Sequence, residues 1–194
     1  MAKISWKPGT MVYPTPAALV SCGSVDKGNA NLITIAWIGT ICTNPPMLSI
    51  SIRPERYSYD IISGEMQFTV NLTTEEMIRA TDWCGVRSGR DYNKFKETGL
   101  TPLQGIVNTC CMVAESPLSI ECRVKTIMHL GSHDMFIADV VNVVADDSFF
   151  DDETGYFDLG AARLASYCHG RYYGLGNVLG SFGFSVKKPQ KKKK

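Results

Sequence analysis

The side chains between residues 50 and 58 have the types and spacing that suit anion binding. Arg53, Arg56 and Ser58 come together where a short helix is expected to begin. Guanidinium groups, a hydroxyl group and the free N–H groups of a helix N-terminus all donate hydrogen bonds to anions. The spacing therefore predicts a site for a phosphate group.

The strand-like run upstream adds an aromatic ring and polar groups. Asn31, Thr34 and Trp37 lie along one run and could present hydrogen-bond donors and a ring to the same ligand. The same residues also suit a purely structural interpretation, in which Trp37 packs in the core and the arginines are simply solvated. The pattern alone leaves both interpretations open.

Two histidines, His129 and His133, have the four-residue spacing with which a helix places two metal ligands together. Gly131 and Ser132 between them favour a hairpin turn instead, so we predict no metal site here. His133 is expected to begin a strand at a loop, where it could donate a hydrogen bond to a phosphate. An exposed turn histidine is the ordinary alternative.

Other catalytic patterns are incomplete. Gly174, Gly176 and Gly180 give GxGxxxG, which is one residue off the dinucleotide fingerprint and lacks a surrounding strand-to-helix unit. There is no GxSxG elbow, and the adjacent Cys168 and His169 would point to opposite faces of a strand. We therefore predict no catalytic side chain of the hydrolase kind, and none is assigned.

Alternation of apolar and polar residues with a period of two predicts antiparallel strands with one buried face. The strand-like runs cover residues 18–23, 31–41, 48–53, 67–72, 120–125 and 135–144. The last run is the most continuously apolar, so we expect it to lie inside the sheet. Pro45 and Pro46 predict a turn between two of these strands.

Helical signals are fewer. Thr73 and Glu76 match a capping box, which predicts a helix from there through about Trp83 that ends near Gly85. Pro54 at a first helical position predicts a second short helix. Because strands follow one another without strand–helix alternation, we predict a mainly-β fold: a closed or nearly closed antiparallel barrel with a few peripheral helices.

Composition narrows the class of protein. A chain of 194 residues with 44% hydrophobic residues can fill one domain, which excludes disorder over most of its length. No run approaches the roughly 18–20 apolar residues of a membrane span. Residues 1–6 lack the apolar core of a signal peptide. We therefore expect one domain over residues 1–188 in a cytoplasmic protein.

Charge and cysteine content narrow the possible partners and the role of the cysteines. The net charge of +1 includes six lysines in residues 187–194, so the rest of the chain carries 1 − 6 = −5. We predict that residues 189–194 form a disordered, solvated tail and that the protein binds neither nucleic acid nor membrane. Seven cysteines without a CxxC pair are expected to be buried, unpaired hydrophobic residues.

The order of several short motifs resembles the flavin reductase and flavoredoxin family. The motifs are NLITIAW (residues 31–37), PPM (45–47), ISIRPERYSY (50–59), FTVNL (68–72), the loop residues Lys94 and Phe95, LGSHDMFIADV (130–140) and FGFSVKK (182–188). The resemblance covers roughly residues 10–188. It implies an FMN-binding split β-barrel that works as a homodimer, with the flavin near the subunit interface.

The resemblance also implies site residues. Contacts to the flavin ring and ribityl chain are expected from Asn31, Thr34, Ala36 and Trp37. The segment that lines the flavin and its phosphate carries Ser51, Ile52, Arg53, Arg56 and Ser58. Lys94 is expected at the phosphate or ribityl chain, His133 in a neighbouring loop, and Tyr167, Tyr172 or Tyr173 over the ring, with Tyr172 assigned to the site.

Two activities follow from the resemblance. One is an NAD(P)H-dependent flavin reductase, which passes a hydride from a reduced nicotinamide to flavin. The other is a flavoredoxin-type carrier, which exchanges electrons with redox proteins and needs no nicotinamide site. A cofactor-free or haem-binding split barrel is a third interpretation. Flavins bring their own redox chemistry, which agrees with the lack of an acid–base cluster.

Overall fold

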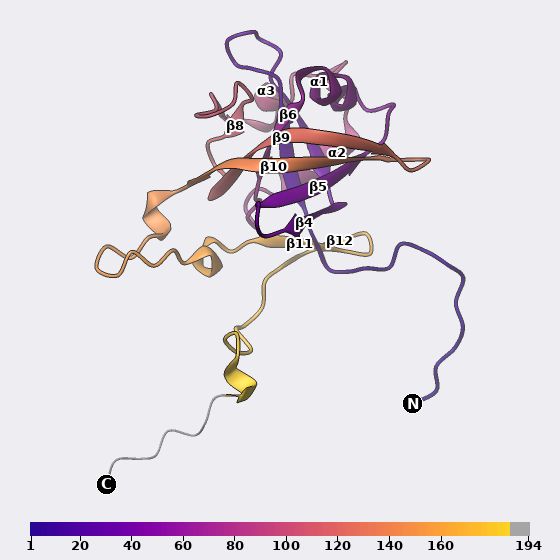
Figure 1. Cartoon of the computed structure of the whole chain (residues 1–194), viewed down its shortest axis with the longest axis vertical. Coiled ribbons are helices and arrows are strands. Elements are labelled where there is room, and N and C mark those ends of the chain that lie inside the picture. Colours follow the sequence, from indigo (N-terminus) through magenta and orange to yellow (C-terminus); the bar gives the residue numbers. More distant parts are fainter. Residues whose placement is uncertain (187–194) are drawn as a thin grey trace.

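A seven-stranded antiparallel sheet forms the body of the molecule (Figure 1). The computed structural model describes residues 1–186, so the tail predicted at residues 189–194 lies outside the described residues. The strands are β2 (Ala18–Cys22), β3 (Asn31–Ile35), β4 (Ile38–Cys42), β5 (Met47–Ile52), β6 (Gln67–Asn71), β9 (Leu118–His129) and β10 (Asp134–Ala145). Their order is β3-β2-β6-β9-β10-β5-β4, which confirms the mainly-β antiparallel prediction and the inner position of β10.

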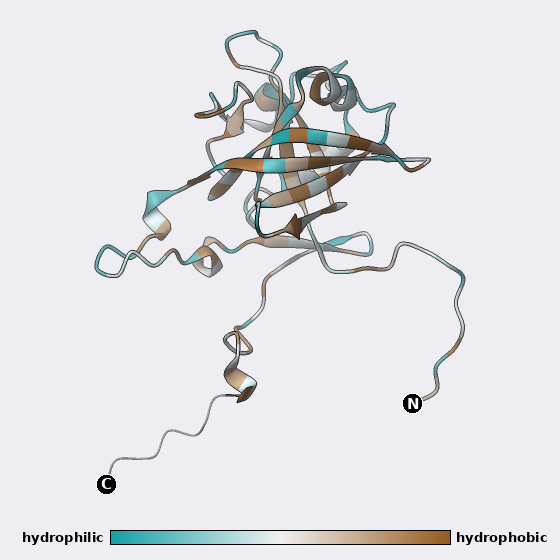
Figure 2. Cartoon of the chain, in the orientation of Figure 1, coloured by the Kyte–Doolittle hydropathy of each residue, from teal (hydrophilic) through white to brown (hydrophobic). Residues whose placement is uncertain are grey.

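The concave side of this curled sheet holds the main core. Leu48, Ile50 and Ile52 are buried on β5 while the residues between them are partly exposed, as the period of two predicts. They pack with Phe68 and Phe136, both fully buried. Figure 2 shows this alternation as brown and pale bands along the strands.

A second core lies between the sheet and the helices. It contains Leu19, Leu32, Met77, Phe95 and Val113, together with two cysteines. All seven cysteines are free, and five of them are buried, which confirms their predicted role as small apolar residues. Together the two cores hold the sheet between them.

The run predicted as one strand over residues 31–41 is instead two strands, β3 and β4, and this prediction was wrong. The chain breaks at Ala36 and Trp37, because β3 pairs with β2 at one edge of the sheet and β4 pairs with β5 at the other. The Ser51 N–H donates to the Trp37 carbonyl oxygen at 2.9 Å. Residues 36–37 therefore cross the open seam between the two edges of the sheet.

Three short helices pack against strands β2, β3 and β6 of the sheet: α1 (Tyr57–Glu65), α2 (Ile78–Val86) and α3 (Lys94–Thr98). Both predicted helix starts were too early. The Arg56 N–H donates to the Arg53 carbonyl oxygen at 3.0 Å, so Pro54 lies in a turn before α1. The Thr73 hydroxyl donates to the Ala17 carbonyl oxygen at 2.5 Å and does not cap α2, whose predicted end is correct to one residue.

A smaller sheet lies beneath the body, in the order β1-β11-β12. Its strands are β1 (Thr15–Pro16), β11 (Ala165–Cys168) and β12 (Arg171–Gly174). The remaining elements are β7 (Pro102–Leu103), β8 (Met112–Val113), and the 3-10 turns η1 (Asp147–Phe149), η2 (Leu159–Ala162) and η3 (Phe184–Val186). Residues 1–12 and 175–186 extend from the side that carries the small sheet (Figure 1).

Within residues 1–186, no helix has both the length and the apolar character needed to cross a membrane.

Candidate functional site

Two adjoining pockets lie at the open seam of the sheet. The basic pocket, of about 180 Å³, lies where α1 begins, and the seam pocket, of about 150 Å³, lies beside Trp37. They share Ile33 and Arg56 as lining residues, so they are neighbours. Joined, they reach the lower end of the size range of ligand pockets, about 300 Å³.

The structure brings eleven of the twelve predicted site residues to these two pockets. The basic pocket contains Asn31, Arg56, Ser58 and Lys94. The seam pocket contains Thr34, Ala36, Trp37, Ser51, Ile52, Arg53, Arg56 and His133. These residues come from four separate stretches of the sequence (31–37, 51–58, 94 and 133) and lie together in the folded chain.

Lys94 is the most unusual member of the basic pocket. Its residue surface is 4% exposed, and its Nζ donates to the Cys84 carbonyl oxygen at 2.7 Å. Burial lowers the pKa of Lys94 below its ordinary value. Among the ion pairs formed within residues 1–186, none involves Lys94. A buried ammonium group without a counter-charge is costly, and an anion bound in the pocket would offset this cost.

The local sequence explains how Lys94 is held. It is the first residue of α3, which the Asn93 side chain caps by accepting a hydrogen bond from the Lys96 N–H at 3.1 Å. Phe95 follows it and is buried in the second core, between the sheet and the helices. The cap and this anchor fix the helix, and the helix directs Lys94 inward towards Cys84.

The N-terminus of α1 forms another side of the basic pocket. The first turn of a helix has N–H groups without intrahelical partners, and they favour negative charge. Ser58 lies in this turn, and its hydroxyl accepts a hydrogen bond from Asn31 Nδ2 at 2.8 Å, which fixes both side chains. Arg56, the residue before the helix, is exposed at the mouth of the pocket.

The loop after α2 adds basic groups that sequence reasoning missed. Arg87 and Arg90 line the basic pocket, and Arg90 donates to the Glu55 carbonyl oxygen at 3.0 Å. Gly89 packs so closely that a Cβ atom there would lie 2.3 Å from Asn31 Oδ1. The stretch GVRSGR, with two glycines and two arginines directly after a predicted helix, was the signal that could have identified this loop.

The seam pocket is less charged and carries an aromatic ring. The Trp37 ring lies 6.1 Å from the Tyr13 ring, centroid to centroid. His133 Nδ1 lies 3.0 Å from the Ser132 hydroxyl in the β9–β10 turn, so the predicted hairpin turn is confirmed. Burial and the positive charge of Arg53 lower the pKa of His133. The neutral imidazole can both donate and accept a hydrogen bond at this edge.

Tyr172 lies apart from the other predicted residues and lines neither pocket. Its hydroxyl donates to Asp82 Oδ1 on α2 at 3.0 Å, and burial together with this bond raises its pKa to about 12. Its ring is 5.6 Å from the Tyr167 ring, which lies 6.0 Å from Tyr13. A row of aromatic rings thus links Tyr172 to Trp37, and its contact with a flavin stays a prediction.

Comparison with known proteins agrees with this arrangement. The family model described as "Flavin reductase like domain" matches residues 10–176. Flavoredoxin of Desulfovibrio vulgaris (Miyazaki F) is 29% identical, with a TM-score of 0.87 over 96% of this chain and 100% of that one.

Two further solved structures share the fold. A split barrel domain protein from Shewanella frigidimarina is 25% identical, with a TM-score of 0.77 over 88% of this chain and 86% of that one. The FMN-binding protein of Thermus thermophilus is 21% identical, with a TM-score of 0.73 over 90% of this chain and 94% of that one. These matches confirm the split-barrel fold.

Proposed function

The chain belongs to the flavin reductase-like family, and from that premise we propose that it binds FMN in the two adjoining pockets and acts as an NAD(P)H:flavin oxidoreductase. The observation that carries the proposal is Lys94, a buried ammonium group at the base of a pocket that adjoins an aromatic one. FMN has the matching parts, because it joins a phosphate dianion to a planar ring.

The basic pocket fits the phosphate. Lys94 offers an ammonium group, Arg56 a guanidinium group, and Ser58 a hydroxyl at the first turn of α1. Charge-assisted hydrogen bonds of this kind are about twice as strong as neutral ones. Asn31 holds Ser58 in place from the neighbouring strand. These residues would fix one end of the ligand.

The seam pocket fits the ring and ribityl chain. Thr34, Ala36 and Trp37 would contact the ligand from the break between β3 and β4, and Ser51, Ile52, Arg53 and His133 from the opposite edge. When bound, a flavin itself supplies the capacity to accept a hydride and to release electrons. The chain's residues orient the ring, and Arg53 favours negative charge near it.

Direct binding is the test of this proposal. The freshly purified protein should show flavin absorption or, if it is colourless, should bind added FMN with one site per chain in a calorimetric titration. The physical reason is the unpaired positive charge in the basic pocket. A protein that is colourless and does not bind added FMN would contradict the proposal. The cofactor-free or haem-binding interpretation would then remain.

A flavoredoxin-type electron carrier is the second candidate, and the likeness to the Desulfovibrio flavoredoxin favours it. The FMN-loaded protein should be mixed anaerobically with NADH or NADPH while flavin absorption is followed. Fast, catalytic bleaching supports the reductase. Bleaching only by a reduced redox protein supports the carrier.

We also propose that the protein works as a homodimer with the site near the subunit interface. The pockets lie at an open seam, so a second copy could shield the ring from water. The mass of the full chain in solution, measured by light scattering, should be twice 21.4 kDa. A monomer at the concentration where FMN binds fully would contradict this part.

A further inference from the structure

The C-terminal arm, residues 176–186, presents apolar side chains to solvent. Val178, Leu179 and Phe182 are 91%, 94% and 107% exposed, and Phe184 and Val186 are exposed as well. The arm extends away from the body on the side of the small sheet (Figure 1), and brown segments mark its apolar residues (Figure 2). Several large apolar side chains on one short segment indicate a surface that meets a partner.

An apolar pocket of about 270 Å³ lies on the same side of the molecule. Three stretches form its walls: residues 14–18, residues 72–73 and residues 164–166, with Leu175 at its rim. Thr15 Oγ1 is buried here and has no hydrogen-bond partner within the described residues. A docked backbone would bury the apolar walls and could satisfy this hydroxyl.

An acidic groove continues from this pocket along the chain. Thr73 in the pocket is followed by Thr74, Glu75 and Glu76 in the groove, and Leu164 is preceded there by Arg163. Glu115 and Asp146 complete the groove, in which the Glu75 carboxylate is paired with Arg163. The surface therefore changes from apolar to acidic in one direction.

The C-terminal sequence changes in the matching order. Apolar residues of the arm are followed by six lysines in residues 187–194. The rest of the chain has a net charge of −5, that is 1 − 6, so the six lysines are opposite in charge to the body of the molecule. Hydropathy and charge along this segment both complement the pocket and the groove.

We propose that residues 176–194 of a second copy dock in the apolar pocket and the acidic groove of the first, and that the exchange is reciprocal. In the same chain, residues 176–186 lead away from the pocket. The Leu175 N–H donates to the Leu164 carbonyl oxygen at 3.2 Å, and Gly174 lies against the Glu75 side chain. The chain is therefore fixed at the rim of its own pocket, and the arm leaves from there.

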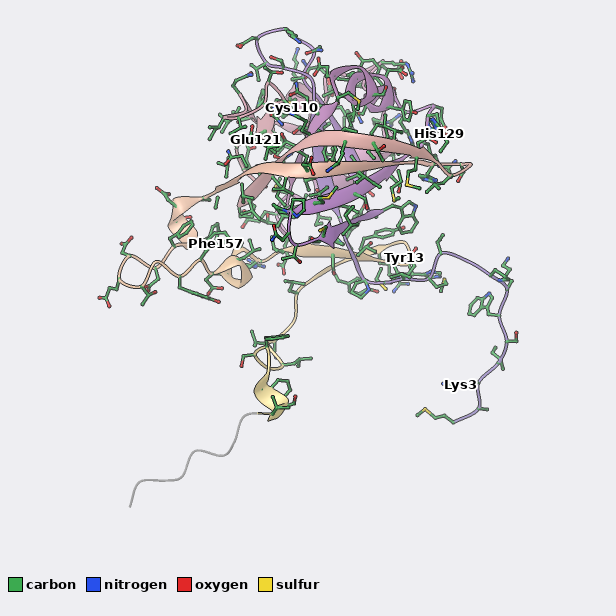
Figure 3. The ribbon with its side chains drawn as sticks, in the orientation of Figure 1. Lys3, Tyr13, Cys110, Glu121, His129 and Phe157 are labelled. Atoms are coloured by element: carbon green, nitrogen blue, oxygen red, sulfur yellow. The ribbon has the colours of Figure 1, made fainter. Side chains whose placement is uncertain are left out.

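A reciprocal exchange also closes the assembly. Each copy has one arm and one pocket, so a two-fold dimer satisfies both and leaves neither exposed. The docked arm would lie close to Tyr13, next to Pro14 of the pocket wall, and Tyr13 contacts Trp37. Figure 3 shows Tyr13 beside the small sheet at the base of the N-terminal arm. The inference does not rest on flavin binding.

Photo-crosslinking tests the docking. A photoreactive phenylalanine, p-benzoylphenylalanine, replaces Leu179 in the full chain, and light and ¹⁵N-labelled copies are mixed before irradiation. We expect crosslinked peptides that join position 179 to residues 14–18 or 164–166, with one light and one heavy partner. The same reporter at Met128, which is exposed on β9, is the matched control and should not reach these residues.

Two outcomes would overturn the proposal: crosslinks to the pocket that join only equal isotopes, or no crosslink to the pocket. In the second case, sedimentation of the protein with vesicles of anionic lipid would assign the arm to a membrane surface instead.

A second measurement uses the double variant Leu179→Asp, Phe182→Asp. Its dimer dissociation constant should rise by about a hundredfold, because both side chains are proposed to anchor the arm. An unchanged dissociation constant would exclude the arm from the interface.

Discussion

Glu121 is a fully buried carboxylate that holds a loop in place. Its two oxygens accept hydrogen bonds from the backbone N–H groups of Ile106, Val107 and Asn108 and from the side chain of Asn142. Figure 3 labels Glu121 within the body of the molecule. All its partners are donors, so the side chain must be an acceptor at both oxygens.

Glu121→Gln should therefore destabilise the fold. The amide of Gln places an NH₂ group against N–H donors, and the loss is expected to be about 1–3 kcal/mol of the free energy of unfolding. Urea unfolding followed by circular dichroism measures it. Glu97→Gln on the exposed side of α3 is the control and should change stability by less than about 0.5 kcal/mol. Equal stability of both variants would mean that the Glu121 contacts contribute nothing.

Gly89 is required by a close approach between the loop after α2 and the site. A Cβ atom there would lie 2.3 Å from Asn31 Oδ1 and 2.7 Å from Tyr57 Cδ1. Gly89→Ala should push the loop outward, lowering stability by about 1–3 kcal/mol and weakening FMN binding. Gly64→Ala on α1 meets no atom within 4 Å and should be neutral or slightly stabilising. Thermal melts measure the stability of both variants, and titrations measure their affinity for FMN. Equal values for the two variants would contradict the prediction.

Individual site residues could be predicted in part. The donor types at Arg56 and Ser58 follow from their spacing, and family resemblance added Lys94. The sequence could not show that Lys94 is buried, because that depends on the capped start of α3 and on the distant Cys84 carbonyl group. Nor could it show that Tyr172 bonds to Asp82, 90 residues away.

Strand positions were more predictable than their ends. Alternation located β5, β6 and β9, because each carries alternate apolar side chains in the core, although Thr69 and Asn71 between those of β6 are buried as well. The break at residues 36–37 was missed because NLITIAWIGTI is apolar on both sides of it, and periodicity does not show that a chain crosses from one sheet edge to the other. The helix starts failed for a similar reason, since tertiary contacts occupied the predicted cap.

A carboxylate joins α1 to the β9–β10 hairpin. Asp134 Oδ2 accepts a hydrogen bond from the Tyr59 hydroxyl at 2.6 Å and lies 2.8 Å from His129 Nδ1. His129 is labelled at this end of the hairpin in Figure 3. The hydrogen bond from Tyr59 lowers the pKa of Asp134, with a smaller contribution from His129.

This contact makes stability depend on pH. Because the pKa of Asp134 is lower in the folded state, the stabilisation is complete above the ordinary pKa of aspartate, about 3.9, and is lost as pH falls through the folded value. Tyr59→Phe should raise the pKa of Asp134 and reduce the loss of stability on acidification. Carbon-detected NMR titration of the Asp134 carboxyl group measures the shift, with Tyr57→Phe on the same helix as the control. An unchanged Asp134 pKa in Tyr59→Phe would contradict the assignment.

The assembled molecule places its basic pocket and its aromatic pocket at the open seam of a split barrel, and residues 1–12 and 175–186 extend from the small-sheet side. The fold class was predictable because strands outnumber helices and follow one another. The arrangement of the arms was not, since a sequence shows which residues are apolar but not which of them stay outside the core.

The central claim is that Lys94 gives the site its affinity for a phosphate. Binding of FMN and of riboflavin, which lacks the phosphate, should be compared by calorimetry in the wild-type protein, in Lys94→Met and in Lys96→Met. Lys96 is the matched control, an exposed lysine on the same helix. The two ligands share the ring, so their difference in affinity isolates the phosphate.

We predict that the wild-type protein and Lys96→Met bind FMN more tightly than riboflavin. Lys94→Met should weaken FMN binding by about 1.5–3 kcal/mol, roughly 10- to 150-fold, and leave riboflavin binding nearly unchanged. An equal preference for FMN in all three proteins would contradict the account.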